Sequence, residues 1–237
     1  MSNVSALRTQ PDNAAFALLQ AAHDAAERVQ RQLPLAPPPA LAAFVADDAP
    51  LAADWLSAGD GRLLVRALRA TLFNVRGHGR SCELLWRSSA AAAVYAVRIA
   101  QLRGIAQRPV AVTALLHRSG KAIALGVLAQ IEAAHKRSLD PVTVHRFVAQ
   151  HEQGMAEALA RDWRLPADIA AAMRDWRSGG AAEPIVTAAA AVYYGQLLAL
   201  AIVDESISAP GARLADLPLG ELLNSRQADT ALLHSLS

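Results

Sequence analysis

The sequence has 237 residues, of which 53% are hydrophobic and 19% charged, with a net charge of +2 and one cysteine. This apolar content excludes an intrinsically disordered chain, and one cysteine excludes an intrachain disulfide framework. So small a charge surplus does not indicate a nucleic-acid-binding protein. Residues 1–30 lack the basic and apolar segments of a secretory signal, and the lone Cys82 suits a reducing compartment, so we expect a cytoplasmic protein.

Helices are predicted throughout, because no segment alternates apolar and polar residues as a half-buried strand does. The first covers residues 13–32, and the prolines of residues 34–39 end it and form a linker. We therefore expect residues 1–33 to be an N-terminal helix and residues 40–237 a helical domain, with a single domain overall. Glycine and proline signals delimit further helices at residues 40–56, 62–75, 81–103, 109–117, 121–135, 141–163, 166–177 and 183–206. The fold class is all-α, a compact bundle of nine or ten helices.

An uncharged segment, residues 185–203, is close to the length that crosses a bilayer. It is mostly alanine and contains Thr187, Gly195 and Gln196, and no lysine or arginine flanks it closely. We interpret it as the buried central helix of a soluble domain and expect no membrane partner. The expected core also includes large apolar residues elsewhere in the chain: Trp86, Leu115, Leu116, Val148, Trp163, Ile169 and Val192.

Three motifs contain the candidate functional residues. Residues 85–89 read Leu-Trp-Arg-Ser-Ser, residues 114–121 read Ala-Leu-Leu-His-Arg-Ser-Gly-Lys, and residues 151–154 read His-Glu-Gln-Gly, followed by Trp163 and Leu165-Pro166. In this order and spacing they resemble the HDOD family, a regulatory branch of the HD-domain superfamily. The family shows Leu-Trp-x-His-Ser, then Leu-Leu-His-Asp-x-Gly-Lys, then a His-x-x-x-Gly helix that ends in Trp-x-Leu-Pro. The resemblance covers about residues 83–175, and residues 217–222 also resemble the family.

The resemblance implies a degenerate metal site. In the parent superfamily, His, His-Asp and Asp ligands hold metals that activate water against a phosphate ester. Here Ser88 stands at the first histidine position, Arg118 replaces the aspartate after His117, and the late aspartate falls near Ala190. The positions that make up this degenerate HD pocket are Ser88, His117, Arg118, Lys121, His151 and Asp175.

Two histidines cannot form a three-ligand catalytic site, and an arginine adds a permanent positive charge where the metal would be. We therefore predict no catalytic residue, no metal and no cofactor. His117 is interpreted as a structural imidazole, bonded to a backbone carbonyl or, through water, to His151. Arg118 is expected to pair with one of three carboxylates: Glu152, Asp162 or Asp175.

The remaining polar residues receive structural interpretations. Lys121 at a helix start is interpreted as solvated, although this position could also hold an anion. Glu132 and His135 have the spacing of a diiron motif, but such sites need two motifs, so we place this pair on a surface face. His78 has no partner pattern, and Cys82 is expected to be an inert thiol.

Two classes of function follow. The first is a non-catalytic signalling module, typical of bacterial regulators as the resemblance implies, that binds a partner protein or a small signal through the degenerate pocket. The alternative is a reduced metal-dependent phosphohydrolase or phosphodiesterase. A third hypothesis is a nucleotide or nucleic-acid binder that uses residues 62–108, where nine arginines face one acidic residue, Glu83. We favour a solvated face for that stretch, because aromatic residues for base stacking are not interleaved with the arginines.

Overall fold

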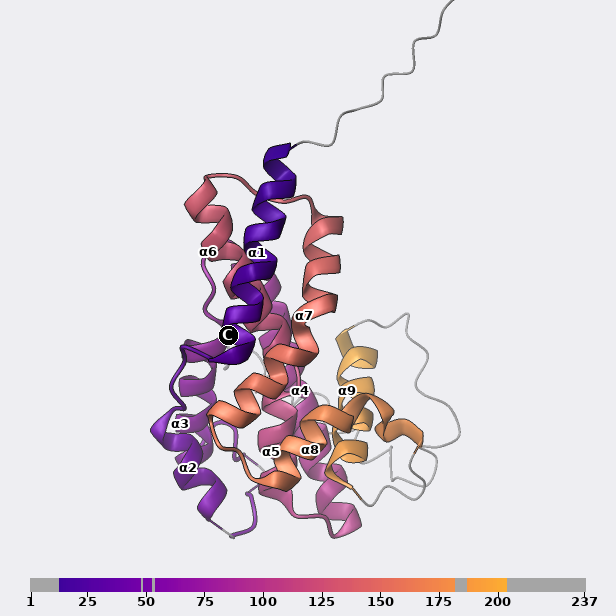
Figure 1. The fold of residues 1–237 in the computed structure, drawn as a ribbon. Helices are drawn as coiled ribbons and strands as arrows, with labels where there is room; N and C mark the ends of the chain where they lie inside the picture. The colour runs from indigo at the N-terminus through magenta and orange to yellow at the C-terminus, as the bar shows by residue number, and fades with distance from the viewer. Residues whose placement is uncertain (1–12, 48, 53, 182–186, 204–237) are drawn as a thin grey trace, which may run out of the picture.

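The computed structural model describes residues 13–47, 49–52, 54–181 and 187–203. These residues form helices joined by turns and loops, with no strand among them (Figure 1). The all-α prediction is confirmed. The helices are α1 (Asn13–Arg31), α2 (Pro39–Ala46), α3 (Gly59–Leu68), α4 (Gly79–Arg103), α5 (Gln107–Leu116), α6 (Ser119–His135), α7 (Pro141–Asp162), α8 (Ala167–Asp175) and α9 (Ala188–Val203). A π-helical turn, η1 (Arg69–Phe73), extends α3, and a 3₁₀ turn, η2 (Trp176–Ala181), extends α8.

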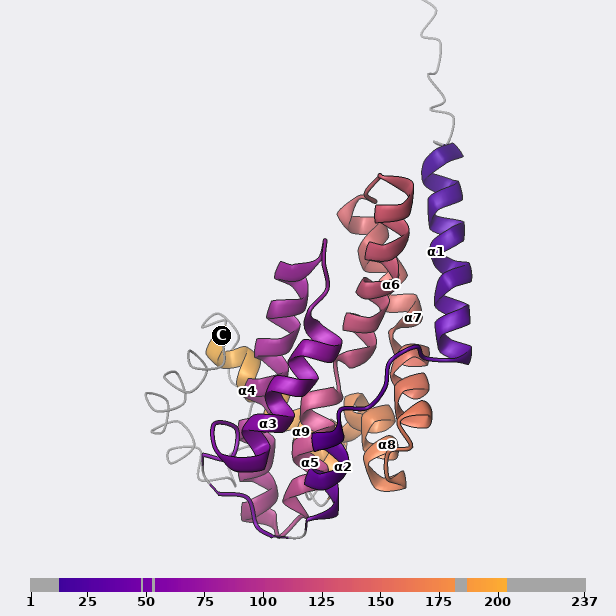
Figure 2. The ribbon, with the colours of Figure 1, turned by 90° about the vertical axis from the view of Figure 1, so that its left-hand side faces the viewer.

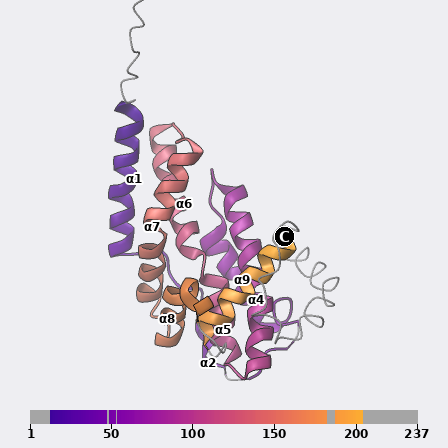
Figure 3. The same ribbon diagram turned by 90° about the vertical axis from the view of Figure 1, so that its right-hand side faces the viewer.

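α4 packs against both α5 and α9, and these two helices also contact each other. The first helix, α1, stands at the edge of the molecule, where it packs along α6 and α7 (Figures 2 and 3). The segment that follows α1 leads away to α2 and α3, which lie beside each other farther down the bundle (Figure 2). α1 is therefore joined to the body mainly through two helices that follow it late in the sequence.

Local signals explain several helix ends. The side chain of Asp140 accepts hydrogen bonds from the N–H groups of Val142 and Thr143, and Pro141 occupies the first helical position, as the sequence predicts for α7. At the end of α4, Gly104 adopts the left-handed conformation with φ of 66°. This conformation lets the next N–H, that of Ile105, bond back to the carbonyl of Ala100 at 2.8 Å.

Small residues bring α4 and α9 into contact. A Cβ atom at Gly195 would lie 2.6 Å from the carbonyl oxygen of Ala92 and 2.8 Å from the amide nitrogen of Ala96, so the two backbones approach directly. Burial of this kind removes apolar surface from water and dominates the stability of the bundle. The predicted core is confirmed, because every one of its members is buried: Trp86, Leu115, Leu116, Val148, Trp163, Ile169 and Val192.

The apolar segment near the C-terminus behaves as a core helix. In its described part, α9, Ala190, Val192 and Leu198 are buried inside the bundle, which confirms that interpretation for residues 188–200. Among the described residues, one stretch is long and apolar enough to cross a membrane, Gln107–His135, which comprises α5 and α6. Of the most apolar part of this stretch, 83% is buried inside the structure, so its apolar surface is covered by the rest of the bundle.

The predicted helix at residues 40–56 is wrong beyond Ala46, where α2 ends. Pro50 has no N–H and disfavours helical backbone before it, and Asp47 accepts a hydrogen bond from the N–H of Ala49 in a local turn. Arg108 then holds this turn by donating to the carbonyls of Phe44 and Ala49. It also pairs with the carboxylate of Asp47.

Two other boundaries differ from prediction. α3 begins at Gly59 instead of residue 62, so Asp60 lies inside its first turn. The break expected at Ser119 and Gly120 falls earlier, at His117 and Arg118, and Ser119 begins α6. The predictions for residues 183–186 and 204–237, including residues 217–222, lie outside the described residues.

Candidate functional site

His117 ends α5 and is buried, with 5% of its surface exposed. Its Nδ1 lies 2.6 Å from the carbonyl oxygen of Ala114, and its Nε2 lies 2.7 Å from Oε1 of Gln196 on α9. The ring also meets Trp176 edge to face, with centroids 4.7 Å apart. Burial, and next the charge of Arg118, lowers the pKa of His117 from 6.5 to about 4, so the imidazole is neutral at pH 7.

Both ring nitrogens of His117 are enclosed by protein atoms. A neutral imidazole has a single N–H, so His117 can donate to only one of these two oxygens, but protein atoms cover both nitrogens. The space left beside the ring, between α6, α7 and η2, has a volume of about 10 Å³, which is room for a single water at most. His117 is therefore a structural imidazole bonded to a backbone carbonyl, as one of the two sequence interpretations proposes.

Gln196 is the polar residue that connects the helices here, and it is buried at 3% exposure. The Ser88 hydroxyl on α4 contacts both amide atoms of Gln196, at 3.0 and 3.2 Å, and Nε of Arg118 donates to Oε1 at 3.3 Å. We call Ser88, His117, Arg118 and Gln196 the His117 cluster. Sequence analysis did not identify Gln196 as part of this cluster. The available signal is that Gln196 is an isolated amide in an apolar helix, and a buried amide needs hydrogen-bond partners.

Glu152 on α7 gathers the basic side chains beside this cluster. Its carboxylate pairs with Lys121 at 3.4 Å and with Arg177. Burial, and to a lesser degree Arg177, lowers the pKa of Arg118, whereas the negative charge of Glu152 opposes that shift. Three cations thus surround one carboxylate, so the region carries positive charge of its own where the resemblance implies a metal. Lys121 is ion-paired, which corrects its interpretation as a solvated lysine.

Of the three carboxylates expected for Arg118, Glu152 is the one whose charge acts on it. Asp162 instead pairs with Arg161 and accepts the N–H of Leu33 at 2.7 Å. Asp175 is exposed at the end of α8, where its carbonyl oxygen accepts a hydrogen bond from the Ser178 hydroxyl.

α6 reaches this region because Gly120 has no side chain. A Cβ atom at Gly120 would lie 2.0 Å from the carbonyl oxygen of Glu152. The start of α6 therefore rests directly on the backbone of α7, which brings Lys121 to the carboxylate of Glu152. The Gly-Lys pair of the second motif thus serves packing and charge pairing in this protein.

His151 lies in a different cluster, on the face of α7 that meets α1. Its Nε2 is 2.7 Å from Nδ1 of His23, its Nδ1 is 3.0 Å from Nε2 of Gln30, and its ring packs on Phe147. The side chain of Gln30 fits because Gly154 leaves space: a Cβ there would lie 2.8 Å from it. One consistent set of bonds has the Gln30 amide donating to His151, and His151 donating to His23.

The structure therefore separates His117 from His151, and a water bridge between them is excluded by the partners each ring already has. The reason is helix phase. Adjacent residues of an α-helix point about 100° apart, so Glu152 faces the His117 cluster while His151 faces α1. Burial, then the charge of His23, lowers the pKa of His151, and Glu27 opposes this. Of the predicted pocket, Ser88, His117, Arg118 and Lys121 come together, whereas His151 and Asp175 lie apart from them.

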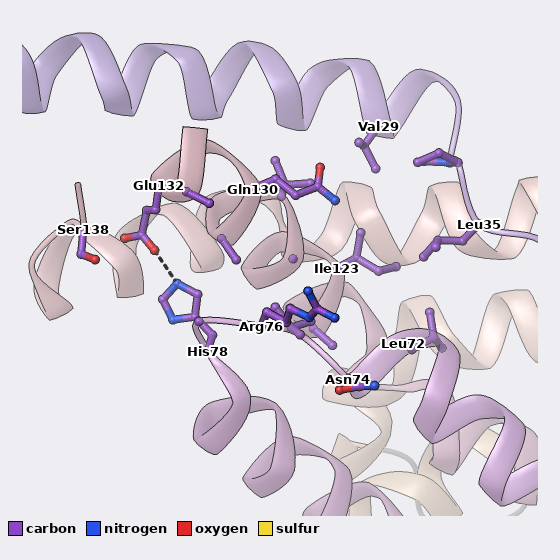
Figure 4. A pocket seen from close by; sticks show the side chains of 18 of the residues that line it. Val29, Leu35, Leu72, Asn74, Arg76, His78, Ile123, Gln130, Glu132 and Ser138 are labelled. Carbon is purple, nitrogen blue, oxygen red and sulfur yellow. Dashed lines mark hydrogen bonds and ion pairs between the residues drawn. The ribbon is translucent and has the colours of Figure 1, made fainter. Parts of the chain in front are cut away.

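A second region, which sequence analysis missed, is a pocket of about 840 Å³ between the end of α1, α6 and residues 74–78 (Figure 4). We call it the α1–α6 pocket. At one end of it Glu132 pairs with Nε2 of His78 at 3.0 Å and accepts the N–H of Leu139 at 2.8 Å. Glu132 is buried at 8% exposure, so its assignment to a surface face is wrong, although His135 is exposed.

The geometry defines the class: an all-helical bundle in which a buried helix delivers a histidine to a polar centre, as in HD-type domains. Within that class the chain carries an HDOD domain, because residues 63–177 match the HDOD family model. The match begins within α3 and leaves the proposed domain limit at residue 40 a prediction. In the described ranges, no group of three or more histidine, cysteine, aspartate or glutamate side chains comes together in a way that could hold a metal ion.

Comparison with solved structures gives one further similarity. The chain aligns over 94% of its length with 88% of a protein from Shewanella amazonensis SB2B that is provisionally described as a phosphohydrolase. The sequence identity is 17% and the TM-score is 0.46. No curated protein matches the chain significantly.

Proposed function

We propose that this protein is a non-catalytic HDOD-type regulatory module, which acts in bacterial signal transduction by binding a protein partner or a small signal in the cytoplasm. The observation that carries the proposal is the closed His117 cluster. Its histidine has a protein oxygen at both nitrogens, and the neighbouring cavity of about 10 Å³ leaves no room for a phosphate ester.

The charges around the cluster also support a regulatory role. Hydrolysis by a metal requires ligands, an open coordination position and a water molecule that the metal activates. Instead, Arg118, Lys121 and Arg177 contribute fixed positive charge, and Glu152 is engaged by two of them. In this arrangement the polar centre joins α4, α5, α7 and α9, and it supports a binding surface elsewhere on the molecule.

The arginine-rich stretch supports the same proposal over nucleic-acid binding. Arg69 and Arg87 both pair with Glu83, and Arg108 is stacked on the ring of Phe44. These arginines stabilise the fold and are partly neutralised. Binding to a nucleotide or a nucleic acid through them would weaken steeply with added salt, so titration of an oligonucleotide at two salt concentrations tests that alternative.

The test of the proposal is metal content and hydrolysis together. The full chain, purified without a histidine tag, is incubated with manganese, iron or zinc, freed of unbound metal and measured by mass spectrometry. The same samples are assayed with bis(p-nitrophenyl) phosphate. We expect no retained metal and no hydrolysis, because the described side chains do not form a ligand set.

A matched pair of variants makes the test decisive. His117→Ala removes the buried histidine, and His135→Ala removes an exposed one as a control for adventitious binding. Near-stoichiometric metal that His117→Ala abolishes and His135→Ala retains would contradict the proposal. If the same samples also hydrolyse the ester, the result would establish instead the alternative of a reduced phosphohydrolase.

A further inference from the structure

The α1–α6 pocket has two chemically different ends (Figure 4). Val29, Leu35 and Leu72 lie toward one end, and the Glu132–His78 ion pair lies at the other. The side chain of Arg76 lies between them. Pockets of 300–1,000 Å³ with apolar walls and a few polar groups are typical small-molecule sites, and a volume of about 840 Å³ falls in that range.

The charge that lines the pocket is positive. Arg76, Lys136 and Arg137 are among the lining residues, and Glu132 is the acidic residue among them. Both oxygens of that carboxylate already accept hydrogen bonds, so it does not need a ligand group. Arg76 is exposed and has no ion-pair or hydrogen-bond partner within the described part of the chain. Its guanidinium is therefore available to an anion.

The wall of the pocket on α6 includes a glycine, Gly126, which has no side chain to fill the space. Gly126 lies in the interior of α6 and lines the pocket, although glycine is a weaker helix former than alanine. A Cβ atom there would meet only Val75, at 3.7 Å, which is ordinary contact. A larger side chain at this position would extend from the wall of α6 into the pocket.

The walls are held in place at the α1 end. The N–H of Leu33 donates to the carboxylate of Asp162, and the indole N–H of Trp163 donates to the carbonyl of Leu35 at 2.8 Å. These bonds fix the segment after α1 to the end of α7. The apolar wall that this segment provides is therefore part of the folded bundle.

We propose that the α1–α6 pocket binds an amphiphilic organic anion, with its apolar body against Val29, Leu35 and Leu72 and its anionic head on Arg76. Such a molecule would be the small signal of the proposed regulatory function, and it would bind away from the His117 cluster. Because the site uses none of the cluster residues, failure of this inference would leave the metal and hydrolysis result unaffected.

The first test is calorimetric titration of the full chain with octanoate, octyl phosphate and octan-1-ol. Octanoate and octyl phosphate separate a carboxylate head from a phosphate head, and the alcohol keeps the apolar body without a charge. We expect saturable binding of at least one anion, at least tenfold tighter than binding of the alcohol. Equal affinity for the alcohol, or no saturation by either anion, would overturn the proposal and leave the pocket as a groove for a protein segment.

Variants locate the binding. Arg76→Gln is expected to weaken anion binding at least tenfold, whereas Arg80→Gln, a nearby exposed arginine outside the pocket, leaves it unchanged. Gly126→Leu is expected to abolish binding by filling the pocket, and Gly126→Ala to retain it. Circular dichroism confirms that each variant is folded. An anion affinity that Arg76→Gln and Gly126→Leu do not change contradicts the proposed site.

Discussion

The His117 cluster and the α1–α6 pocket place polar residues in opposite settings. In the cluster, three residues of recognisable motifs, Ser88, His117 and Arg118, contact Gln196 at 2.7 to 3.3 Å, and about 10 Å³ of space is left beside the histidine ring. In the pocket, residues outside every motif surround about 840 Å³. The difference shows that a recognisable motif does not by itself mark a binding site. Its residues can equally serve to pack a buried polar cluster.

Two glycines of α6 provide the sharpest contrast, and substitution of the first should have the largest effect. Gly120→Ala places a methyl group 2.0 Å from the carbonyl oxygen of Glu152, so α6 must move away from α7. We expect a loss of about 3 kcal/mol in the free energy of unfolding. Urea denaturation measures it, and a loss below about 0.5 kcal/mol would show that the cluster is loosely packed.

The second prediction concerns acid and the cluster. The pKa of His117 falls from 6.5 to about 4 on folding, so the unfolded chain binds a proton more readily than the folded chain. Stability is therefore complete above pH 6.5 and decreases as the pH falls toward 4, by about 3 kcal/mol. Unfolding free energies measured across this range should show this slope in the parent protein and lose that part of it in His117→Gln.

The exposed His145 provides the control for this slope. His145→Gln should keep the pH dependence of the parent protein, because this substitution leaves the buried His117 in place. If His117→Gln retains the full slope, the imidazole of His117 is not held in its neutral form.

The third prediction concerns the imidazole pair that joins α1 to α7. His151 has a lowered pKa, so acid favours states in which α1 has separated from it. A proton added to His151 would place a positive charge beside His23, whose Nδ1 lies 2.7 Å from Nε2 of His151, with Glu27 as the nearby opposing charge. Amide hydrogen exchange, corrected for intrinsic rates, should be faster in α1 at pH 5 than at pH 7.5. His23→Gln should reduce that difference, and equal exchange in parent and variant would contradict this role.

The smallest effect is expected at the open pocket. Gly126→Ala adds a methyl group at 3.7 Å from Val75 and replaces a weak helix former. We expect a gain of about 0.5–1 kcal/mol in the free energy of unfolding, the opposite sign to the change at Gly120. Urea denaturation of both variants side by side compares them directly, and a loss of stability in Gly126→Ala would mean that the pocket is tighter than its volume indicates.

The sequence predicts those features of the fold that depend on neighbouring residues, such as helix starts and buried helix faces. Asp140 and Pro141 are adjacent, so the start of α7 could be predicted from capping alone. Core residues such as Trp86 and Val192 follow from apolar spacing along helices. The early end of α2 combines a local signal, Pro50, with a distant one, because Arg108, which holds the turn, lies 61 residues beyond its partner Asp47.

Only part of the candidate site could be predicted, because its other contacts join residues that are far apart in the sequence. Ser88 and Gln196 are 108 residues apart, and nothing in a single sequence links them. Likewise, Glu132 and His78 are separated by 54 residues, so the pair that ends the α1–α6 pocket could not be found from spacing. The motif identified His151, but the phase of α7, which tertiary packing sets, decides that it faces α1.

The position of α1 makes it a shared wall, since Val29 lines the pocket while His23 meets the imidazole of α7. A ligand in the pocket gains its contact with Val29 only when α1 is docked, so binding and docking are thermodynamically linked. The coupling is reciprocal: a bound molecule would tighten the imidazole contact, and protonation of that contact would lower the molecule's affinity by the same factor. The docking equilibrium of α1 would then respond both to a ligand bound in the pocket and to pH.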